Sequence, residues 1–330
     1  MNARRLICPD RRKIEVESYD PGPVPSDGLL VENLYTAVSI GTEVYNWIHG
    51  SEPGRQSMFP RVTGYCSVGR ALEVGSDVEG IQTGDLVAGQ GNHASHAVLR
   101  TSYNRVPGAV DPRQAAFTVM SAIALHGIRV AQVQLGESVV VFGLGLVGQI
   151  AAKLARLSGG LPVIGIDLDA FRIEKAIQNG CDIALHPEKV DLIEEIRSRC
   201  AEDGANIVLE STGKPVVYPT AAALACQGGR VVALGSPRGT VDMDFLTNVH
   251  LREVSILGAH QPKTPDDDHI YYRFYKKRER DLVLHLMAVG RLDLDDLITH
   301  THVPESCQEV YDELAETPVD TLGVLFDWTR

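Results

Sequence analysis

The chain has 330 residues, of which 44% are hydrophobic and 22% are charged, as is typical of a globular protein with two domains. Its net charge of −12 argues against nucleic acid or an anionic membrane surface as a partner. No apolar stretch reaches the roughly 18 residues of a membrane span, and the N-terminal sequence lacks the hydrophobic region of a signal peptide. The six cysteines are scattered and form no C-x-x-C pair. We therefore expect a cytoplasmic protein with reduced thiols and no membrane partner.

The first third of the chain reads as an antiparallel β domain. Residues 13–106 contain short β-type runs separated by turn residues, and this punctuation favours a compact barrel over βαβ units. A helix is expected from Asp111 onward, because an aspartate cap is followed by Pro112 at the first helical position and a helical apolar period continues to about residue 133. This helix is expected to lead into a second domain.

The strongest motif follows a short apolar strand at residues 139–142. Gly143, Gly145 and Gly148 have the G-x-G-x-x-G spacing, and residues 149–157 continue with a helical apolar period. The first glycine allows a tight turn, the second lets the main chain approach a pyrophosphate, and the third lets the helix pack closely on the strand. The sequence therefore predicts a dinucleotide site, with phosphates at the helix N-terminus that begins near Leu146 and Val147.

An acidic residue completes this motif. A second apolar strand, residues 162–166, ends at Asp167, which follows Gly143 by 24 positions and is suited to accept both hydroxyls of an adenosine ribose. Its carboxylate would repel a ribose 2′-phosphate, so NAD is the expected cofactor rather than NADP. Arg172 is a candidate to stack on the adenine or to shift that preference.

Strands and helices then alternate as far as about residue 261. This alternation predicts an α/β, doubly wound parallel sheet that binds its ligand at the carboxyl ends of the strands. Thr212, Gly235 and Ser236 follow such strands and are expected to contact the cofactor. The expected elements are helices at 170–179, 189–201 and 215–226, and strands at 206–212, 230–236 and 250–260.

The tail of the chain is expected to return to the first domain, because it is too short for a core of its own. Residues 261–269 are polar and irregular, residues 270–290 read as a helix, and a strand, a helix and a closing strand follow. An aromatic and basic cluster begins this helix, and we expect its rings to pack on the barrel, although a rim for substrate or cofactor is the alternative. The cluster comprises Tyr271, Tyr272, Phe274, Tyr275, Lys276, Lys277, Arg278 and Arg280.

Two further motifs carry a family resemblance. Gly41-Thr42-Glu43 and the segment GYCSVG at residues 64–69, together with the nucleotide fold, resemble the medium-chain dehydrogenase/reductase superfamily of zinc alcohol and polyol dehydrogenases over nearly the whole chain. The resemblance implies a GroES-like β-barrel catalytic domain at residues 1–117 and 262–330 and a Rossmann NAD-binding domain at residues 118–261. It also implies a homodimer, because members of the superfamily commonly pair an edge strand, here at residues 254–258, across a dimer axis.

The positions that hold catalytic zinc in this superfamily depart from its pattern. By resemblance they are Ile40, Tyr65 and an apolar residue identified as Val119. Isoleucine and valine have no lone pair to donate, and a neutral phenol is a poor ligand. Cys66 replaces the glutamate of the family's G-H-E motif, but one thiol does not make a site. We therefore expect no metal.

Without a metal, a protein group must handle the proton of the reacting hydroxyl. Thr42 matches the relay hydroxyl of the superfamily, Tyr45 matches its relay histidine, and Tyr65 stands at a former ligand position. We expect Thr42 to act with either Tyr45 or Tyr65. His93 lies in a segment that resembles one beside the family's substrate pocket, and is a candidate substrate contact or acid/base group. Glu43 is expected to orient its loop by accepting hydrogen bonds.

These residues lead to one main functional hypothesis and two alternatives. The main one is an NAD-dependent, zinc-independent alcohol dehydrogenase or ketoreductase, acting on a secondary hydroxyl of a polyol, cyclitol, sugar derivative or similar small alcohol or ketone. Some of the sequence motifs are also similar to those of bacteriochlorophyllide a dehydrogenase, which implies that a bulky secondary alcohol is a possible substrate as well. The alternatives are a zinc-free NAD(P)H quinone or enoyl reductase, and a nucleotide-binding protein that has lost catalysis.

Overall fold

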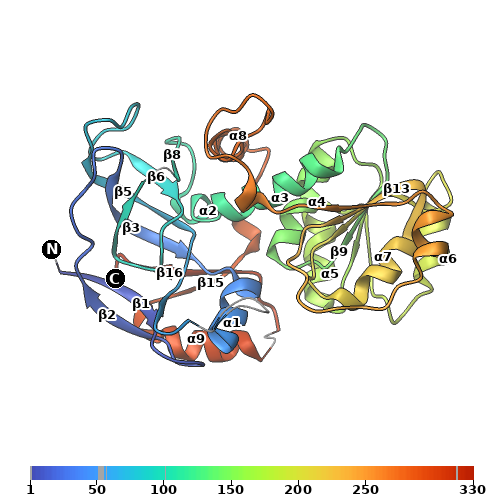
Figure 1. Ribbon diagram of the computed structural model, residues 1–330, viewed down its shortest axis with the longest axis horizontal. Helices are drawn as coiled ribbons and strands as arrows, with labels where there is room; N and C mark the ends of the chain where they lie inside the picture. The colour runs from blue at the N-terminus through green and yellow to red at the C-terminus, as the bar shows by residue number, and fades with distance from the viewer. Residues whose placement is uncertain (1, 51–55, 57, 101, 317–318) are drawn as a thin grey trace. The chain divides into compact units, whose positions relative to one another are not determined.

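The two ends of the chain fold together, and the middle forms a unit of its own (Figure 1). The computed structural model describes residues 2–50, 56, 58–100, 102–316 and 319–330. Unit 1 combines the chain up to Ala122 with residues Thr264–Arg330, and unit 2 is the continuous segment Ile123–Lys263. Within the described residues, no helix has both the length and the apolar character needed to cross a membrane.

Unit 1 is rich in antiparallel strands. One sheet has the order β2-β1-β4, and the other has the order β15-β16-β3-β5-β6-β8, with β7 pairing with β3. The only parallel neighbours among these described strands are β15 and β16, and β16 pairs antiparallel with β3, which ties the tail to the first third of the chain. The strands are β1 (Ala3–Cys8), β2 (Glu15–Tyr19), β3 (Leu29–Ala37), β4 (Arg61–Val62), β5 (Ser67–Val74), β6 (Leu86–Gly89), β7 (His96–Leu99), β8 (Tyr103–Arg105), β15 (Ile298–His302) and β16 (Gly323–Asp327).

The main core of unit 1 joins its first and last elements. Helix α1 (Ile40–His49) contributes Trp47, α9 (Cys307–Ala315) contributes Tyr311, and β16 contributes Phe326. These large side chains are buried together, and the rings of Trp47 and Tyr311 meet edge to face with centroids 5.8 Å apart. The last turn of α1 is therefore packed against side chains of α9 and β16.

The helix expected from Asp111 is interrupted. Asp111 caps α2 (Pro112–Ala115) through its side chain and Pro112 takes the first position, as predicted, but α3 begins separately and spans Thr118–Ala131. At the break the Phe117 N–H donates to the carbonyl of Gln114, only three residues back, and the Thr118 hydroxyl donates to the carbonyl of Ala115. The apolar period continues across the break, which is why the sequence suggested one helix.

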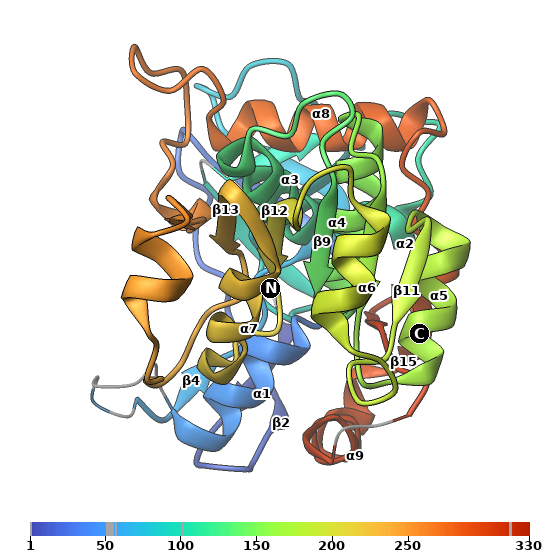
Figure 2. The ribbon, with the colours of Figure 1, turned by 90° about the vertical axis from the view of Figure 1, so that its right-hand side faces the viewer.

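Unit 2 contains the parallel sheet that the sequence predicts. Its order is β11-β10-β9-β12-β13-β14, and all neighbours are parallel. The order reverses between β9 and β12, and open α/β sheets bind ligands outside the carboxyl ends of the strands at such a point. Figure 2 shows β13, β12 and β9 side by side. The strands are β9 (Val139–Phe142), β10 (Val163–Ile166), β11 (Ile183–Leu185), β12 (Ala205–Glu210), β13 (Ala225–Ala233) and β14 (Ser255–Gly258).

Helices cover both faces of this sheet, so the predicted fold class is confirmed. Residues of α6 and α7 share a core with Val140 of β9, whereas Val139 and Val141 point to the opposite face. Figure 1 shows α4 and α6 on opposite sides of the sheet. The helices are α4 (Leu146–Leu157), α5 (Ala170–Asn179), α6 (Leu192–Arg199) and α7 (Tyr218–Leu224). Helix α5 ends at Gly180, which has φ +147°, as the sequence predicted.

Several elements of unit 2 differ from the prediction: strand β11 was not expected, and β13 begins at Ala225 and not at residue 230. The helix expected to reach Cys226 ends at Leu224, because Ala225 already pairs with Ala205 in the sheet. The segment before β14 is not extended, since residues 246–250 form a π-helical turn whose Thr247 N–H is capped by Asp244. The remaining single-turn helices are Pro215–Val217, Gln261–Lys263, Asp295–Leu297 and Pro304–Ser306.

The aromatic residues of the tail cluster are not helical, and the expected packing is wrong for two of its rings, Tyr271 and Tyr272, whereas Phe274 and Tyr275 are half-buried. Helix α8 spans Lys276–Ala288, so the rings precede it. Tyr271 is 85% exposed and Tyr272 is 45% exposed. The main chain turns back before the helix, because the Lys276 N–H donates to the carbonyl of Pro265. This hydrogen bond sets the start of α8 at Lys276, whereas the local apolar period alone would start the helix earlier.

Candidate active site

The glycine-rich turn of unit 2 connects β9 to α4. Gly143 has φ +94°, a conformation that favours glycine, and it carries the chain out of the buried strand. Gly145 is the N-cap of α4, no side chain caps this helix, and a Cβ at Gly145 would meet nothing within 4 Å. The start of α4, at Leu146 and Val147, therefore faces open space, as an anion-binding helix N-terminus does.

The third glycine lies where the helix touches the turn. A Cβ on Gly148 would be 1.9 Å from the carbonyl oxygen of Gly143 and 2.8 Å from Oγ of Ser211. The Ser211 hydroxyl in turn donates to that same Gly143 oxygen over 2.6 Å. Only glycine fits at position 148, and the close packing it permits gives the turn the shape of a dinucleotide cradle.

Asp167 lies at the carboxyl end of β10, beside this turn. Its Oδ2 accepts the Leu144 N–H over 2.6 Å, and its Oδ1 accepts the Asp169 N–H over 2.9 Å. The carboxylate is thus fixed next to the glycine turn, the position at which the sequence predicted it. The main-chain oxygen of Arg172 accepts from Nε2 of Gln149 over 2.8 Å, which ties α5 to α4.

A buried carboxylate shapes the neighbouring turn. Glu210, at the end of β12, accepts the Thr212 N–H over 2.7 Å and also its hydroxyl, and its main-chain oxygen accepts the Gly235 N–H. A Cβ on Gly213 would be 2.7 Å from the carbonyl oxygen of Ser236, so the turns after β12 and β13 meet. Burial raises the pKa of Glu210 despite these hydrogen bonds. Glu210 was not among the predicted site residues, although an acidic residue that ends a buried strand just before Ser-Thr-Gly is a signal in the sequence.

In unit 1, a chain of hydroxyl groups gathers at the start of α1. The Tyr65 phenol donates to Oγ of Ser39 over 2.5 Å, and Thr42 also hydrogen-bonds to the Tyr65 side chain. Burial raises the pKa of Tyr65, so its phenol stays protonated at neutral pH. We call Ser39, Thr42 and Tyr65 the hydroxyl cluster. Tyr45 makes a different contact, because its ring lies against that of His49 with centroids 4.4 Å apart.

Beneath the hydroxyl cluster, Glu43 is the centre of a buried polar network. Its Oε1 accepts the Ser39 N–H over 2.8 Å, so the expected role in orienting this loop is confirmed. Its Oε2 accepts from Thr63 over 2.8 Å, from Tyr311 over 2.7 Å and from Nε2 of His93 over 2.9 Å. Burial alone raises the pKa of Glu43, but His93, Tyr311 and the Ser39 N–H together lower it below its ordinary value. Glu43 is therefore a carboxylate with four donors.

His93 lies inside the core and not at a surface. It is fully buried, its Nδ1 is 2.7 Å from Oγ1 of Thr36, and its ring meets Phe326 edge to face. The sequence pointed to His93 through its resemblance to a pocket segment, but its partners come from β3, α1 and β16. Tyr311 and Thr36 were missed, because nothing local marks them as polar members of a core.

The positions that would hold catalytic zinc are brought together, yet they do not fit a metal. Ile40 follows Ser39, and Cys66 follows Tyr65 and hydrogen-bonds to the main chain of Met120, the neighbour of Val119. Burial raises the pKa of the Cys66 thiol well above its ordinary value, which disfavours the thiolate that zinc needs. No group of three or more His, Cys, Asp or Glu side chains in the described part of the chain is arranged to hold a metal ion.

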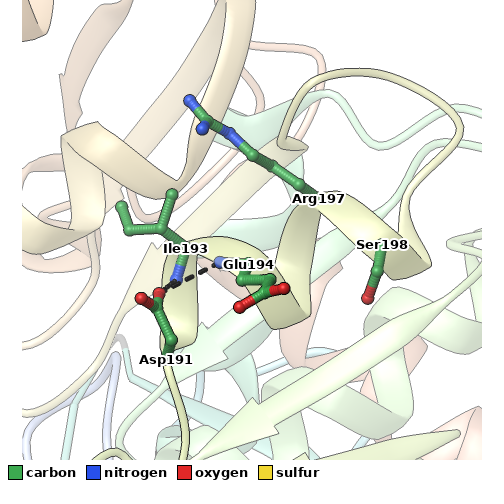
Figure 3. A pocket seen from close by; sticks show the side chains of 5 residues that line it. All are labelled: Asp191, Ile193, Glu194, Arg197 and Ser198. Atoms are coloured by element: carbon green, nitrogen blue, oxygen red, sulfur yellow. Dashed lines mark hydrogen bonds between the residues drawn. The ribbon is translucent and has the colours of Figure 1, made fainter.

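One surface hollow of unit 2 is lined by none of these residues. It is formed by one face of α6 and is lined by Asp191, Ile193, Glu194, Arg197 and Ser198 (Figure 3). The Asp191 carboxylate caps α6 by accepting the N–H groups of Ile193 and Glu194. This hollow contains none of the predicted site residues; Asp191 caps the helix, and Arg197 pairs with Asp203.

Comparison with known proteins agrees with this architecture. The zinc-binding dehydrogenase family matches residues 147–272. The chain is 30% identical to the D-guloside 3-dehydrogenase of Escherichia coli K12, over 98% of this chain and 100% of that protein. The chain therefore belongs to the medium-chain dehydrogenase/reductase superfamily, as its motifs predicted.

Solved structures show the same fold. A zinc-binding dehydrogenase of Sinorhizobium meliloti bound to NADP has a TM-score of 0.85 at 21% identity, and covers 99% of each chain. An alcohol dehydrogenase of Escherichia coli CFT073 complexed with NADH has a TM-score of 0.85 at 17% identity, again covering 99% of each chain. At these identities the likeness establishes the fold alone.

Proposed function

We propose that this protein is an NAD-dependent, zinc-independent alcohol dehydrogenase that oxidises a secondary hydroxyl of a sugar derivative, polyol or cyclitol, or reduces the matching ketone. Membership of the superfamily and the similarity to a D-guloside 3-dehydrogenase support a dehydrogenase of hydroxyl groups, with a sugar derivative as the first substrate class to test. Hydride transfer needs a nicotinamide cofactor and a group that manages the substrate oxygen.

The residues for the cofactor lie in unit 2. When bound, the nicotinamide supplies a hydride acceptor in oxidation and a hydride donor in reduction. The N-terminus of α4, opened by Gly145, would hold the pyrophosphate, and Asp167 would accept the ribose hydroxyls. Arg172, Thr212, Gly235 and Ser236 belong to the same proposed site.

The residues for the substrate oxygen lie in unit 1. The Thr42 hydroxyl would accept the proton of the substrate hydroxyl and pass its own to Tyr65, the Tyr65 phenol would pass its proton to Ser39, and Ser39 would release a proton to solvent water. In reduction the same hydroxyl would donate to the developing alkoxide. Of the two tyrosines, Tyr65 is favoured over Tyr45 by its hydrogen bonds to Thr42 and Ser39. These bonds are the observation that carries the proposal, because they supply a proton path at the former zinc site.

A substrate screen tests this function. The chain is incubated with NAD and a panel of alcohols including glycosides, polyols and cyclitols, and NADH is followed by absorbance. We expect turnover of a secondary alcohol, unchanged by chelator, with less than one zinc per chain by elemental analysis. A stoichiometric zinc whose removal abolishes turnover would refute zinc independence. Tight NADH binding without turnover of any alcohol or ketone would favour a nucleotide-binding protein instead.

Cofactor choice has its own test. One structural neighbour was solved with NADP and another with NADH, so the fold accommodates both. Asp167 beside the glycine turn supports NAD. Fluorescence titration should give a lower Kd for NADH than for NADPH, and D167N should narrow the difference. A lower Kd for NADPH in the unaltered chain would overturn this assignment and favour the quinone or enoyl reductases.

Assembly and compartment complete the proposal. β14 is an edge strand of the described sheet, and exposed Phe245, Leu246, Leu251 and Ile256 lie in and before it, which supports a homodimer paired through this edge. Light scattering of the purified chain tests it. All six cysteines are unpaired, which supports a reducing, cytoplasmic compartment.

A further inference from the structure

A line of hydrogen bonds runs through the core of unit 1 from Trp328, directly after β16, to Glu43. Nε1 of Trp328 lies 3.0 Å from Oγ1 of Thr36, which lies 2.7 Å from Nδ1 of His93. Nε2 of His93 then lies 2.9 Å from Oε2 of Glu43. All four side chains are buried, so none of them takes part in the proton path proposed above.

The residue types at the two ends fix the direction of these bonds. An indole N–H can only donate, so Trp328 occupies a lone pair of Thr36, and a carboxylate can only accept, so His93 presents an Nε2–H to Glu43. In a neutral imidazole with its proton on Nε2, Nδ1 accepts the Thr36 hydroxyl. The network therefore requires an Nε2–H on His93, directed at Glu43.

The other oxygen of Glu43 carries this order to the hydroxyl cluster. Oε1 accepts the N–H of Ser39, the N-cap of α1. Oγ of Ser39 makes no hydrogen bond to its own helix, and it accepts the Tyr65 phenol instead. With its proton committed to Ser39, Tyr65 has its lone pairs free for the Thr42 hydroxyl. The positions of the Thr42 and Tyr65 hydroxyls thus depend on Ser39, and the position of Ser39 depends on Glu43.

We propose that His93 and Glu43 are positioning residues. Through the hydrogen bond from Nε2–H of His93 to Glu43, they hold the Ser39 main chain so that Thr42 and Tyr65 keep the geometry in which they meet a substrate hydroxyl. This inference rests on the proposed function. The two side chains act from within the core, since His93 is 0% exposed and Glu43 is 3% exposed.

A spectroscopic test on the unaltered chain addresses the tautomer. With ¹⁵N-labelled histidine, two-bond correlation spectra report which ring nitrogen carries the proton, and the His93 signals are assigned by their loss in H93Q. We expect a proton on Nε2, the nitrogen that faces Glu43. An unprotonated Nε2 would overturn the inference.

A matched pair of variants addresses the positioning. T36V keeps the shape of the side chain and removes the hydroxyl, whereas T36S keeps the hydroxyl. We expect T36V to lower kcat for the alcohol by about tenfold or more with the Kd for NADH unchanged, and T36S to stay within about twofold of the unaltered chain. T36V should also shift the ¹³Cζ resonance of the Tyr65 phenol, and T36S should not. Thermal melts confirm that each variant is folded, and T36S with the ¹⁵N spectra remains informative if T36V is not.

The possible failures are distinguishable. Equal kcat values and equal Tyr65 resonances in T36V and T36S would refute positioning while leaving the dehydrogenase intact. If the unaltered chain oxidises no alcohol, the proposed function fails, and the His93 spectra and the Tyr65 resonance still decide whether the core network sets the hydroxyl cluster.

Discussion

Replacing Gly148 by alanine tests whether the close contact in the glycine turn organises unit 2. The new methyl carbon would stand 1.9 Å from the carbonyl oxygen of Gly143 and 3.0 Å from its carbonyl carbon. Unstrained contacts between carbon and a carbonyl oxygen begin at about 3.3 Å, so the helix and the turn must separate by about 1.4 Å. The Gly143 oxygen cannot simply move away, because it accepts the Ser211 hydroxyl at the end of the neighbouring strand.

The magnitude follows from this overlap. Overpacking a well-packed interior costs about 1 to 3 kcal/mol, and the rigid main-chain neighbours place G148A near the upper end, at about 3 kcal/mol of unfolding free energy. Because the turn itself is displaced, NADH binding should weaken as well.

Gly145 offers a matched control. Its φ of −65° and ψ of 179° suit alanine, and the added methyl group would meet nothing within 4 Å. The loss of glycine at an N-cap should cost about 1 kcal/mol at most. The methyl group would nevertheless enter the open space before α4, where the pyrophosphate is expected. G145A should therefore stay folded and bind NADH about tenfold more weakly or worse.

Urea unfolding and NADH fluorescence titration measure the two effects. Unfolding of G148A at the urea concentration of the unaltered chain would show that the packing argument is wrong. Unchanged NADH affinity in G145A would show that the phosphates do not lie at this helix N-terminus.

Three further predictions concern unit 1 and the thiols. Y65F should lower kcat about a hundredfold while Y45F stays within a few-fold, as measured by steady-state NADH formation, and equal effects would count against Tyr65 as the proton-handling tyrosine. Because the pKa of Glu43 is lowered in the folded state, its carboxylate should stabilise the fold above the ordinary pKa of 4.5, and this stabilisation should be lost as the pH falls through the folded-state pKa. The free energy of unfolding in urea should therefore fall less steeply on acidification in E43Q than in the unaltered chain. Parallel curves of stability against pH would contradict this. Among the cysteines, half-buried Cys200 should react first with iodoacetamide and Cys66 should be protected, as read by mass spectrometry; earlier labelling of Cys66 would contradict its burial and raised pKa.

The fold of unit 2 was predictable because its signals are local. The glycine spacing, the buried strand before it and the capping Gly180 each act over a few residues, and the parallel sheet follows from their order along the chain. Predictions failed where a distant partner decided the structure. The predicted helix includes residues 270–275, but the bond from Lys276 to Pro265 fixes where α8 begins, and pairing with Ala205 starts a strand at Ala225.

The candidate site divides in the same way. The motif Gly41-Thr42-Glu43 predicted hydroxyl groups and an acid. The sequence also indicated that the residues at the zinc positions of the superfamily are not metal ligands. The network beneath them was not, since Tyr311 is 268 positions from Glu43 and Trp328 is 292 positions from Thr36. A buried tyrosine and a buried threonine carry no local sign of serving one carboxylate, so their roles emerge only from three-dimensional packing.

The discontinuous composition of unit 1 also has a consequence for the order of folding during synthesis. Unit 2 is one continuous segment, so all of its strands are available before residues 264–330 have been made. The sheet partner of β3 in this segment, β16, and the Trp328 indole that donates to Thr36 both emerge after the whole of unit 2. Until then Glu43 lacks Tyr311 and does not have its full set of hydrogen-bond donors. Unit 2 can therefore form its sheet during synthesis before unit 1 can complete its core.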